Sequence, residues 1–202
     1  MLVEKSLIDD IVKNFQNDNF VTEEFNNENT IKDRTWVIDP IDGTAHYMRE
    51  SLFWGIQLAF VDKGEVRFSI IYLPKLDELY YAIKDRGVFL NHKAITLDIM
   101  PVNRSIVEFC GSCHKLYEEK KNLFEKIIKS GVRPANFMHL NSCSVAFCNL
   151  LSGRTNTLVV STKKSWDILP GVFMMEEMKV KSYYHNDLMI YSLTEGFEQF
   201  LV

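Results

Sequence analysis

Residues 35–44 read TWVIDPIDGT, a short apolar run that ends in two acids separated by two residues. The apolar run predicts a buried strand over residues 34–39, because β-branched and aromatic side chains fit a pleated sheet. A proline then turns the chain, so the carboxylates of Asp39 and Asp42 can converge instead of facing opposite sides of the sheet. A fold that contains this stretch must end a strand beside an acidic site.

Two convergent carboxylates attract a hard divalent cation, and a ligand set made only of oxygens favours Mg²⁺. The carbonyl oxygen of Ile41 is free to join them, because a turn leaves carbonyls outside a sheet ladder. Gly43 lets the backbone approach a ligand closely, and a helix that begins near Thr44 would point its N–H groups at an anion such as phosphate. The alternative is an ordinary turn, because Asp, Pro and Gly all favour turns. These residues alone leave both interpretations open.

The order of the expected elements divides the chain near residue 100. The first half begins with a helix over residues 3–15 and a mostly loop-like stretch over 16–33, after which several strands follow one another. The second half alternates strands with helices, including a helix over 115–129 that ends at Gly131. We therefore expect two subdomains, an antiparallel-sheet α+β unit over residues 1–100 and an α/β unit over 101–202.

Composition excludes several classes of function. The 202 residues carry a formal net charge of −4, which argues against a basic nucleic-acid-binding surface. The sequence has no apolar run of 18 residues and its first residues do not resemble a signal peptide, so we expect no membrane contact and a cytoplasmic location. The cysteines, Cys110, Cys113, Cys143 and Cys148, have spacings that a zinc site uses, but the second pair lies in an apolar helix-like run that favours core thiols.

Several stretches together resemble the inositol monophosphatase family of Mg²⁺-dependent, lithium-sensitive phosphatases. WVIDPIDGT resembles the first signature of this family and SWDILPG its second. VEKSLIDDIVKNFQNDNFVTEE resembles the helix that runs into a metal-binding Glu, and NSCSVAFCNLLSG resembles the helix whose N-terminus lies near the substrate. The resemblance covers nearly the whole chain. It implies an α+β fold, a layered αβαβα sandwich of the inositol monophosphatase/sugar phosphatase type that is N-terminally shortened, and it suggests a homodimer.

The resemblance also implies a role for each matching position. The metal ligands would be Glu23, Asp39, the Ile41 carbonyl, Asp42 and Asp167. Substrate would contact Asp42, Gly43, Thr44 and Ser144. Glu23 and Thr44 would be catalytic, with the Thr44 hydroxyl in the pair that activates the attacking water. The second subdomain would complete the active site of the first.

The sequence departs from the family pattern at two places near the expected site. The Asp that works with the family's Thr would precede Met1, and the acid expected near Val160 is absent, with Lys163 and Lys164 following instead. These lysines indicate either a solvated loop or a pocket for a second anionic group. We expect a phosphoric monoester hydrolase that uses Mg²⁺ to act on a small phosphorylated polyol, sugar or nucleotide. The alternative is a truncated or degenerate family member that binds metal, phosphate or a partner without turnover.

Overall fold

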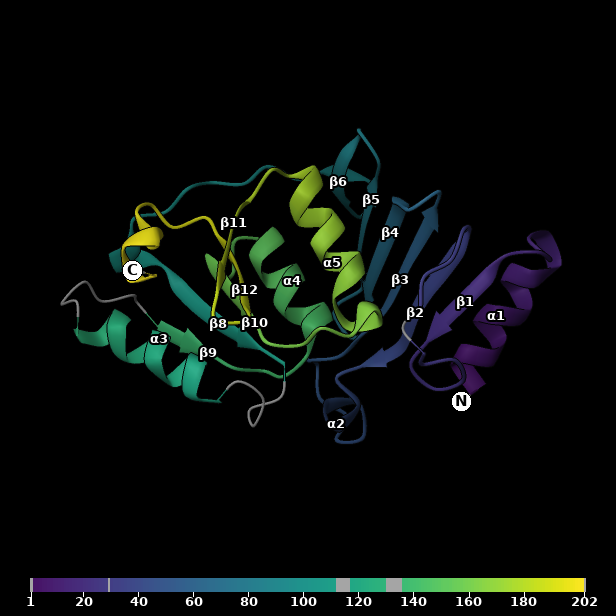
Figure 1. Cartoon of the computed structure of the whole chain (residues 1–202), viewed down its shortest axis with the longest axis horizontal. Coiled ribbons are helices and arrows are strands. Elements are labelled where there is room, and N and C mark those ends of the chain that lie inside the picture. The colour runs from purple at the N-terminus through teal and green to yellow at the C-terminus, as the bar shows by residue number, and fades with distance from the viewer. Residues whose placement is uncertain (1, 29, 112–116, 130–135, 202) are drawn as a thin grey trace.

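The computed structural model describes residues 2–28, 30–111, 117–129 and 136–201. Two β-sheets alternate with three helical layers, so the described chain is an αβαβα sandwich (Figure 1). Helix α1 (Leu2–Asn14) covers the outer face of the first sheet, and α3 (Tyr117–Lys129) packs on the outer face of the second. Helices α4 (Cys143–Leu151) and α5 (Ser165–Glu177) lie between the sheets. The expected α+β fold, a layered αβαβα sandwich, is confirmed.

The first sheet contains seven strands in sequence order. They are β1 (Asn19–Thr22), β2 (Thr35–Asp42), β3 (Gly55–Asp62), β4 (Glu65–Leu73), β5 (Glu78–Ile83), β6 (Gly87–Leu90) and β7 (Lys93–Ala94). Neighbours are antiparallel, except that β1 runs parallel to β2. Strand β1 lies in the stretch that the sequence predicts to be mostly loop. Its four residues are too few to show a period between polar flanks, and pairing with β2 stabilises them.

Strand β2 is longer than the sequence predicts, and its irregular end brings the two acids together. Asp39 pairs with Gln57 and Asp42 with Gly55, so three steps along β2 match two steps along β3. In a regular strand, side chains three residues apart point to opposite faces of the sheet. The extra residue of a β-bulge removes that alternation and lets both carboxylates lie on one side.

The second sheet contains five strands in the order β11-β12-β10-β8-β9. They are β8 (Ile106–Cys110), β9 (Asn136–Met138), β10 (Thr157–Val160), β11 (Lys181–His185) and β12 (Leu188–Ser192). Strand β8 is parallel to both of its neighbours, whereas β12 is antiparallel to both of its own. Short 3₁₀ helices span Val102–Arg104 and Phe197–Phe200. The expected end of the 115–129 helix at Gly131 lies outside the described residues.

The central helical layer joins the two sheets. All nine residues of α4 are buried, and α5 crosses it so closely that a Cβ on Gly171 would lie 2.2 Å from the Phe147 ring. Helix α5 belongs to the second half of the sequence but also packs on strands of the first sheet through Trp166 and Leu169. The division into two subdomains at residue 100 therefore stays a prediction. No helix among the described residues is long and apolar enough to cross a membrane.

Candidate metal centre

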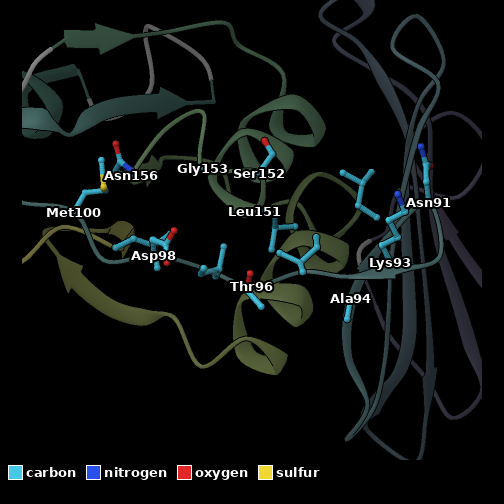
Figure 2. A pocket seen from close by; sticks show the side chains of 14 residues that line it. Asn91, Lys93, Ala94, Thr96, Asp98, Met100, Leu151, Ser152, Gly153 and Asn156 are labelled. Atoms are coloured by element: carbon cyan, nitrogen blue, oxygen red, sulfur yellow. The ribbon is translucent and has the colours of Figure 1, made fainter.

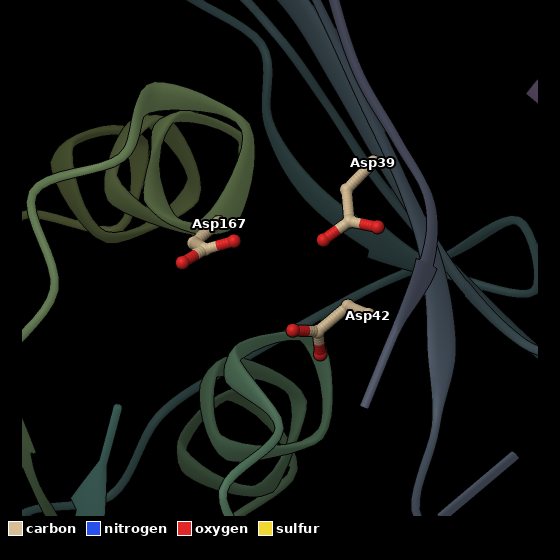
Figure 3. A group of neighbouring side chains, drawn as sticks. All are labelled: Asp39, Asp42 and Asp167. Carbon is tan, nitrogen blue, oxygen red and sulfur yellow. The ribbon is translucent and has the colours of Figure 1, made fainter. Parts of the chain in front are cut away.

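Three aspartates converge where the first sheet meets the central helices. Asp39 and Asp42 extend from the irregular end of β2, and Asp167 extends from the first turn of α5 (Figure 3). One carboxylate oxygen from each of the three lies within 4.8 Å of the others. Among the described residues, this is the group of His, Cys, Asp and Glu side chains that could hold a metal ion.

Asp42 also satisfies the N-terminus of α4, a hundred residues further along the chain. Its Oδ2 accepts hydrogen bonds from the hydroxyls of Ser142 and Ser144, both at 2.6 Å, and from the Ser144 backbone N–H at 2.8 Å. Its Oδ1 accepts from the Cys143 N–H at 3.2 Å. A carboxylate is favourable there because the first N–H groups of a helix lack internal acceptors and the dipole attracts negative charge. These donors fix Asp42 in one orientation.

The three carboxylates share more negative charge than their surroundings neutralise. Burial and then the charges of Asp42, Glu23 and Asp167 raise the pKa of Asp39 well above its ordinary value. Burial and then the charge of Asp42 raise the pKa of Asp167 from 3.8 to about 6. A divalent cation would remove this mutual repulsion, and the donor set consists of oxygens, as Mg²⁺ prefers. The residues present therefore fit a magnesium site.

A cavity of about 360 Å³ opens onto the aspartates. Its lining includes seven of the eight positions that the family resemblance assigns to the site, namely Glu23, Asp39, Ile41, Asp42, Gly43, Thr44 and Asp167. The eighth, Ser144, is fully buried, and its hydroxyl bonds to Asp42. The backbone of the lining is tightly packed. Gly43 has a φ of 82°, and a Cβ there would lie 2.8 Å from the Phe53 carbonyl oxygen.

Helix α2 (Thr44–Tyr47) begins at Thr44 as expected and forms one wall of this cavity. The Thr44 hydroxyl donates a hydrogen bond to the Ile41 carbonyl at 3.2 Å, which closes the turn. His46 reaches across to the loop before α4, where its Nε2 lies 2.5 Å from the Leu140 carbonyl oxygen. His46 therefore links α2 to the loop before α4, and its ring also packs edge-on against Phe53.

Glu4 is a residue of the site that sequence reasoning missed. Its side chain is fully buried on α1, and its carboxylate accepts hydrogen bonds from the backbone N–H groups of Glu24 at 3.2 Å and Phe25 at 3.0 Å. These bonds anchor the loop that carries Glu23 into the cavity. The helical period places Glu4 beside the apolar residues of α1, but a charged residue at that position gives no sign of its distant partners.

The two neighbouring lysines of the second half have different surroundings. Lys163 is exposed and pairs with Asp187 at 2.6 Å, so it fits the solvated-loop interpretation. Lys164 lines the cavity, and its Nζ lies 3.7 Å from a carboxylate oxygen of Glu23. Burial raises the pKa of Glu23, and the Lys164 ammonium opposes that rise.

The three cysteines in the described part of the chain do not form a candidate metal site. All three are buried in the same core cluster between the sheets, where the sulfurs of Cys110 and Cys143 lie 2.6 Å from one another. Cys113 lies outside the described residues. The described thiols are thus core residues, and the carboxylate cluster is the better candidate for a metal site.

A larger cavity of about 660 Å³ lies between the β6–β7 hairpin and the C-terminal end of α4 (Figure 2). Its polar lining residues include Asn91, Lys93, Asp98 and Asn156. These side chains extend from different segments and do not form a convergent group of acids (Figure 2). The chemistry of the lining, and not the size of the cavity, therefore places the candidate site at the three aspartates.

Comparison with known proteins agrees with the fold. The model of the inositol monophosphatase family matches residues 1–179. A Thermotoga maritima protein named fructose-1,6-bisphosphatase/inositol-1-monophosphatase is 30% identical over 174 residues, which are 86% of this chain and 65% of that protein.

Solved structures of similar proteins share the architecture. An inositol monophosphatase of Thermotoga maritima is 25% identical and superposes with a TM-score of 0.80. The superposition covers 97% of this chain and 76% of the Thermotoga chain. An inositol monophosphatase/NADP phosphatase, solved with Mg²⁺ and phosphate, is 19% identical with a TM-score of 0.83, over 99% and 78% of the two chains, and shows the shared fold. With a family match over most of its residues, this chain belongs to the inositol monophosphatase family.

Proposed function

We propose that this protein hydrolyses a small phosphate monoester, such as a phosphorylated polyol or sugar, in a reaction that requires Mg²⁺. The observation that carries the proposal is the convergence of Asp39, Asp42 and Asp167 on one point of an open cavity. Phosphoryl transfer needs little covalent help from the protein, so a site that holds metal and phosphate in register supplies most of the chemistry.

The residues of the cavity divide this work between them. Asp39, Asp42 and Asp167 would hold Mg²⁺, with Glu23 and the Ile41 carbonyl as further oxygen donors. Bound Mg²⁺ supplies charge neutralisation at the phosphate and lowers the pKa of water.

The turn after β2 would receive the phosphate. The backbone N–H groups of Gly43 and Thr44 would donate hydrogen bonds to it. Glycine at residue 43 keeps this turn compact, because a Cβ there would lie 2.8 Å from the Phe53 carbonyl oxygen. The Thr44 hydroxyl would orient the attacking water. Ser144 would act through Asp42, whose oxygen it holds at 2.6 Å, while direct contact of Ser144 with substrate stays a prediction.

The named relatives support the substrate class. One is named for fructose 1,6-bisphosphate and inositol 1-phosphate, and another was solved with Mg²⁺ and phosphate. The chain spans 65% of the length of the first relative, so the activity of that whole protein extends to this chain only as part of the proposal.

Phosphate release from a panel of phosphorylated polyols, sugars and nucleotides tests the proposal. We expect release with MgCl₂ and none with EDTA. Folded protein that binds Mg²⁺ but releases no phosphate from any ester would contradict the proposal and favour the alternative, a family member that binds without turnover.

A further inference from the structure

Lys164 occupies a position where a cation is electrostatically unfavourable. It is the residue immediately before α5, at the N-terminal end of the helix. Ser, Thr, Asp and Asn are preferred there, because their oxygens accept from free N–H groups, and the helix dipole repels positive charge. Lys164 makes no side-chain hydrogen bond that caps the helix. Its surroundings must therefore supply a compensating interaction.

The compensation comes from the carboxylate cavity. The Lys164 ammonium lies 3.7 Å from Glu23 and 5.2 Å from the centroid of the Trp166 ring, which restricts the long side chain to the cavity side of the helix. Lys164 lines the same cavity as the three aspartates.

We infer that Lys164 is a built-in counter-ion of the carboxylate cluster, which competes with a divalent cation for Glu23 and so weakens the affinity of the site for metal. The inference rests on the proposed function, because it concerns the same cluster. A fixed ammonium and a divalent cation that share one set of carboxylates repel each other, and each reduces the attraction that the carboxylates offer the other. Lys164 is thus a residue that tunes metal affinity.

Lys163 provides a matched control. It precedes Lys164, carries the same charge and has the same side chain, but it pairs with Asp187 away from the cavity. Replacing either lysine by methionine removes one positive charge from the protein and keeps an unbranched side chain. A difference between the two variants therefore reports the position of the charge and not the net charge of the protein.

Titration calorimetry of MgCl₂ into EDTA-treated, dialysed protein tests the inference without reference to activity. We expect K164M to bind Mg²⁺ about tenfold more tightly than the unchanged protein at low salt, and K163M to stay within about twofold. K164R keeps the cation and should bind no more tightly than the unchanged protein. The gain of K164M should shrink as salt screens the ammonium.

Unchanged or weaker Mg²⁺ affinity in K164M, or an equal gain in K163M, would overturn the inference and leave the proposed function standing. Conversely, tight Mg²⁺ binding without phosphate release from any ester would contradict the proposed function and leave the role of Lys164 intact. Thermal melting of each variant in EDTA verifies that the protein is folded.

Discussion

Replacing Asp167 by Asn should stabilise the metal-free protein while weakening its response to Mg²⁺. Burial and the charge of Asp42 raise the pKa of Asp167 from 3.8 to about 6. The folded protein therefore holds this proton more tightly than the unfolded chain does, and stability falls as the pH rises from 3.8 to about 6. At about 1.4 kcal/mol for each pH unit, the loss at neutral pH is at most about 3 kcal/mol. Asparagine carries no charge and so avoids this loss of stability, and its oxygen can still accept the 2.9 Å hydrogen bond from Thr162.

Urea unfolding in EDTA measures this effect. We expect the free energy of unfolding of D167N to exceed that of the unchanged protein by up to about 3 kcal/mol at pH 7.5, and by little at pH 4. For a chain of this size, the difference at pH 7.5 corresponds to roughly 6–12 °C in Tm. Added MgCl₂ should raise the Tm of the unchanged protein more than that of D167N. Asp187 is an exposed carboxylate outside the cluster, so D187N should change stability by less than about 0.5 kcal/mol. A D167N variant that is no more stable at pH 7.5, or whose advantage persists at pH 4, refutes the reasoning.

Three other substitutions test two buried carboxylates and the glycine of the turn after β2. Burial raises the pKa of Glu108 from 4.5 to about 7, so the advantage of E108Q in urea unfolding should grow by about 3 kcal/mol between pH 4.5 and 8; a constant difference would contradict this. E4A removes the acceptor of the Glu24 N–H and one of the two acceptors of the Phe25 N–H, and should cost about 1–2 kcal/mol and weaken Mg²⁺ binding in calorimetry, whereas E4Q, which keeps an acceptor, should lose less. G43A forces a Cβ to within 2.8 Å of the Phe53 carbonyl at a φ of 82°, and should lower the free energy of unfolding by about 1–3 kcal/mol; an unchanged value would show that the turn can relax.

Much of the fold can be predicted from the sequence because its signals are local. Alternating side chains and turn residues predict the strands of the first sheet after residue 50, and helical spacing predicts α1 and α3, whereas the three-residue strand β9 is not predicted. The sequence also predicts that the carboxylates of Asp39 and Asp42 lie near one another, because proline and glycine mark the end of a strand. The sequence does not predict the β-bulge that turns both carboxylates to one side, since the bulge depends on how β2 pairs with β3.

The residues that support the site are harder to predict because their partners are distant in sequence. Glu4 holds a loop 20 residues away, and Asp42 receives hydrogen bonds from the N-terminus of α4, 100 or more residues away. No spacing rule connects such pairs. Ser144 is an example, because its position suggests a substrate contact, whereas in the structure its hydroxyl is buried against Asp42.

Mg²⁺-dependent phosphate release by the unchanged protein and by D42N tests the central claim most directly. Asp42 lies in the carboxylate cluster and holds the first turn of α4; asparagine removes the charge and the acceptor of the Cys143 N–H, but keeps an oxygen for Ser142 and Ser144. We predict phosphate release that requires Mg²⁺ in the unchanged protein and falls to background in folded D42N. Release that persists in EDTA, or D42N rates close to those of the unchanged protein, would contradict the assignment of this cluster as the metal centre of a phosphatase.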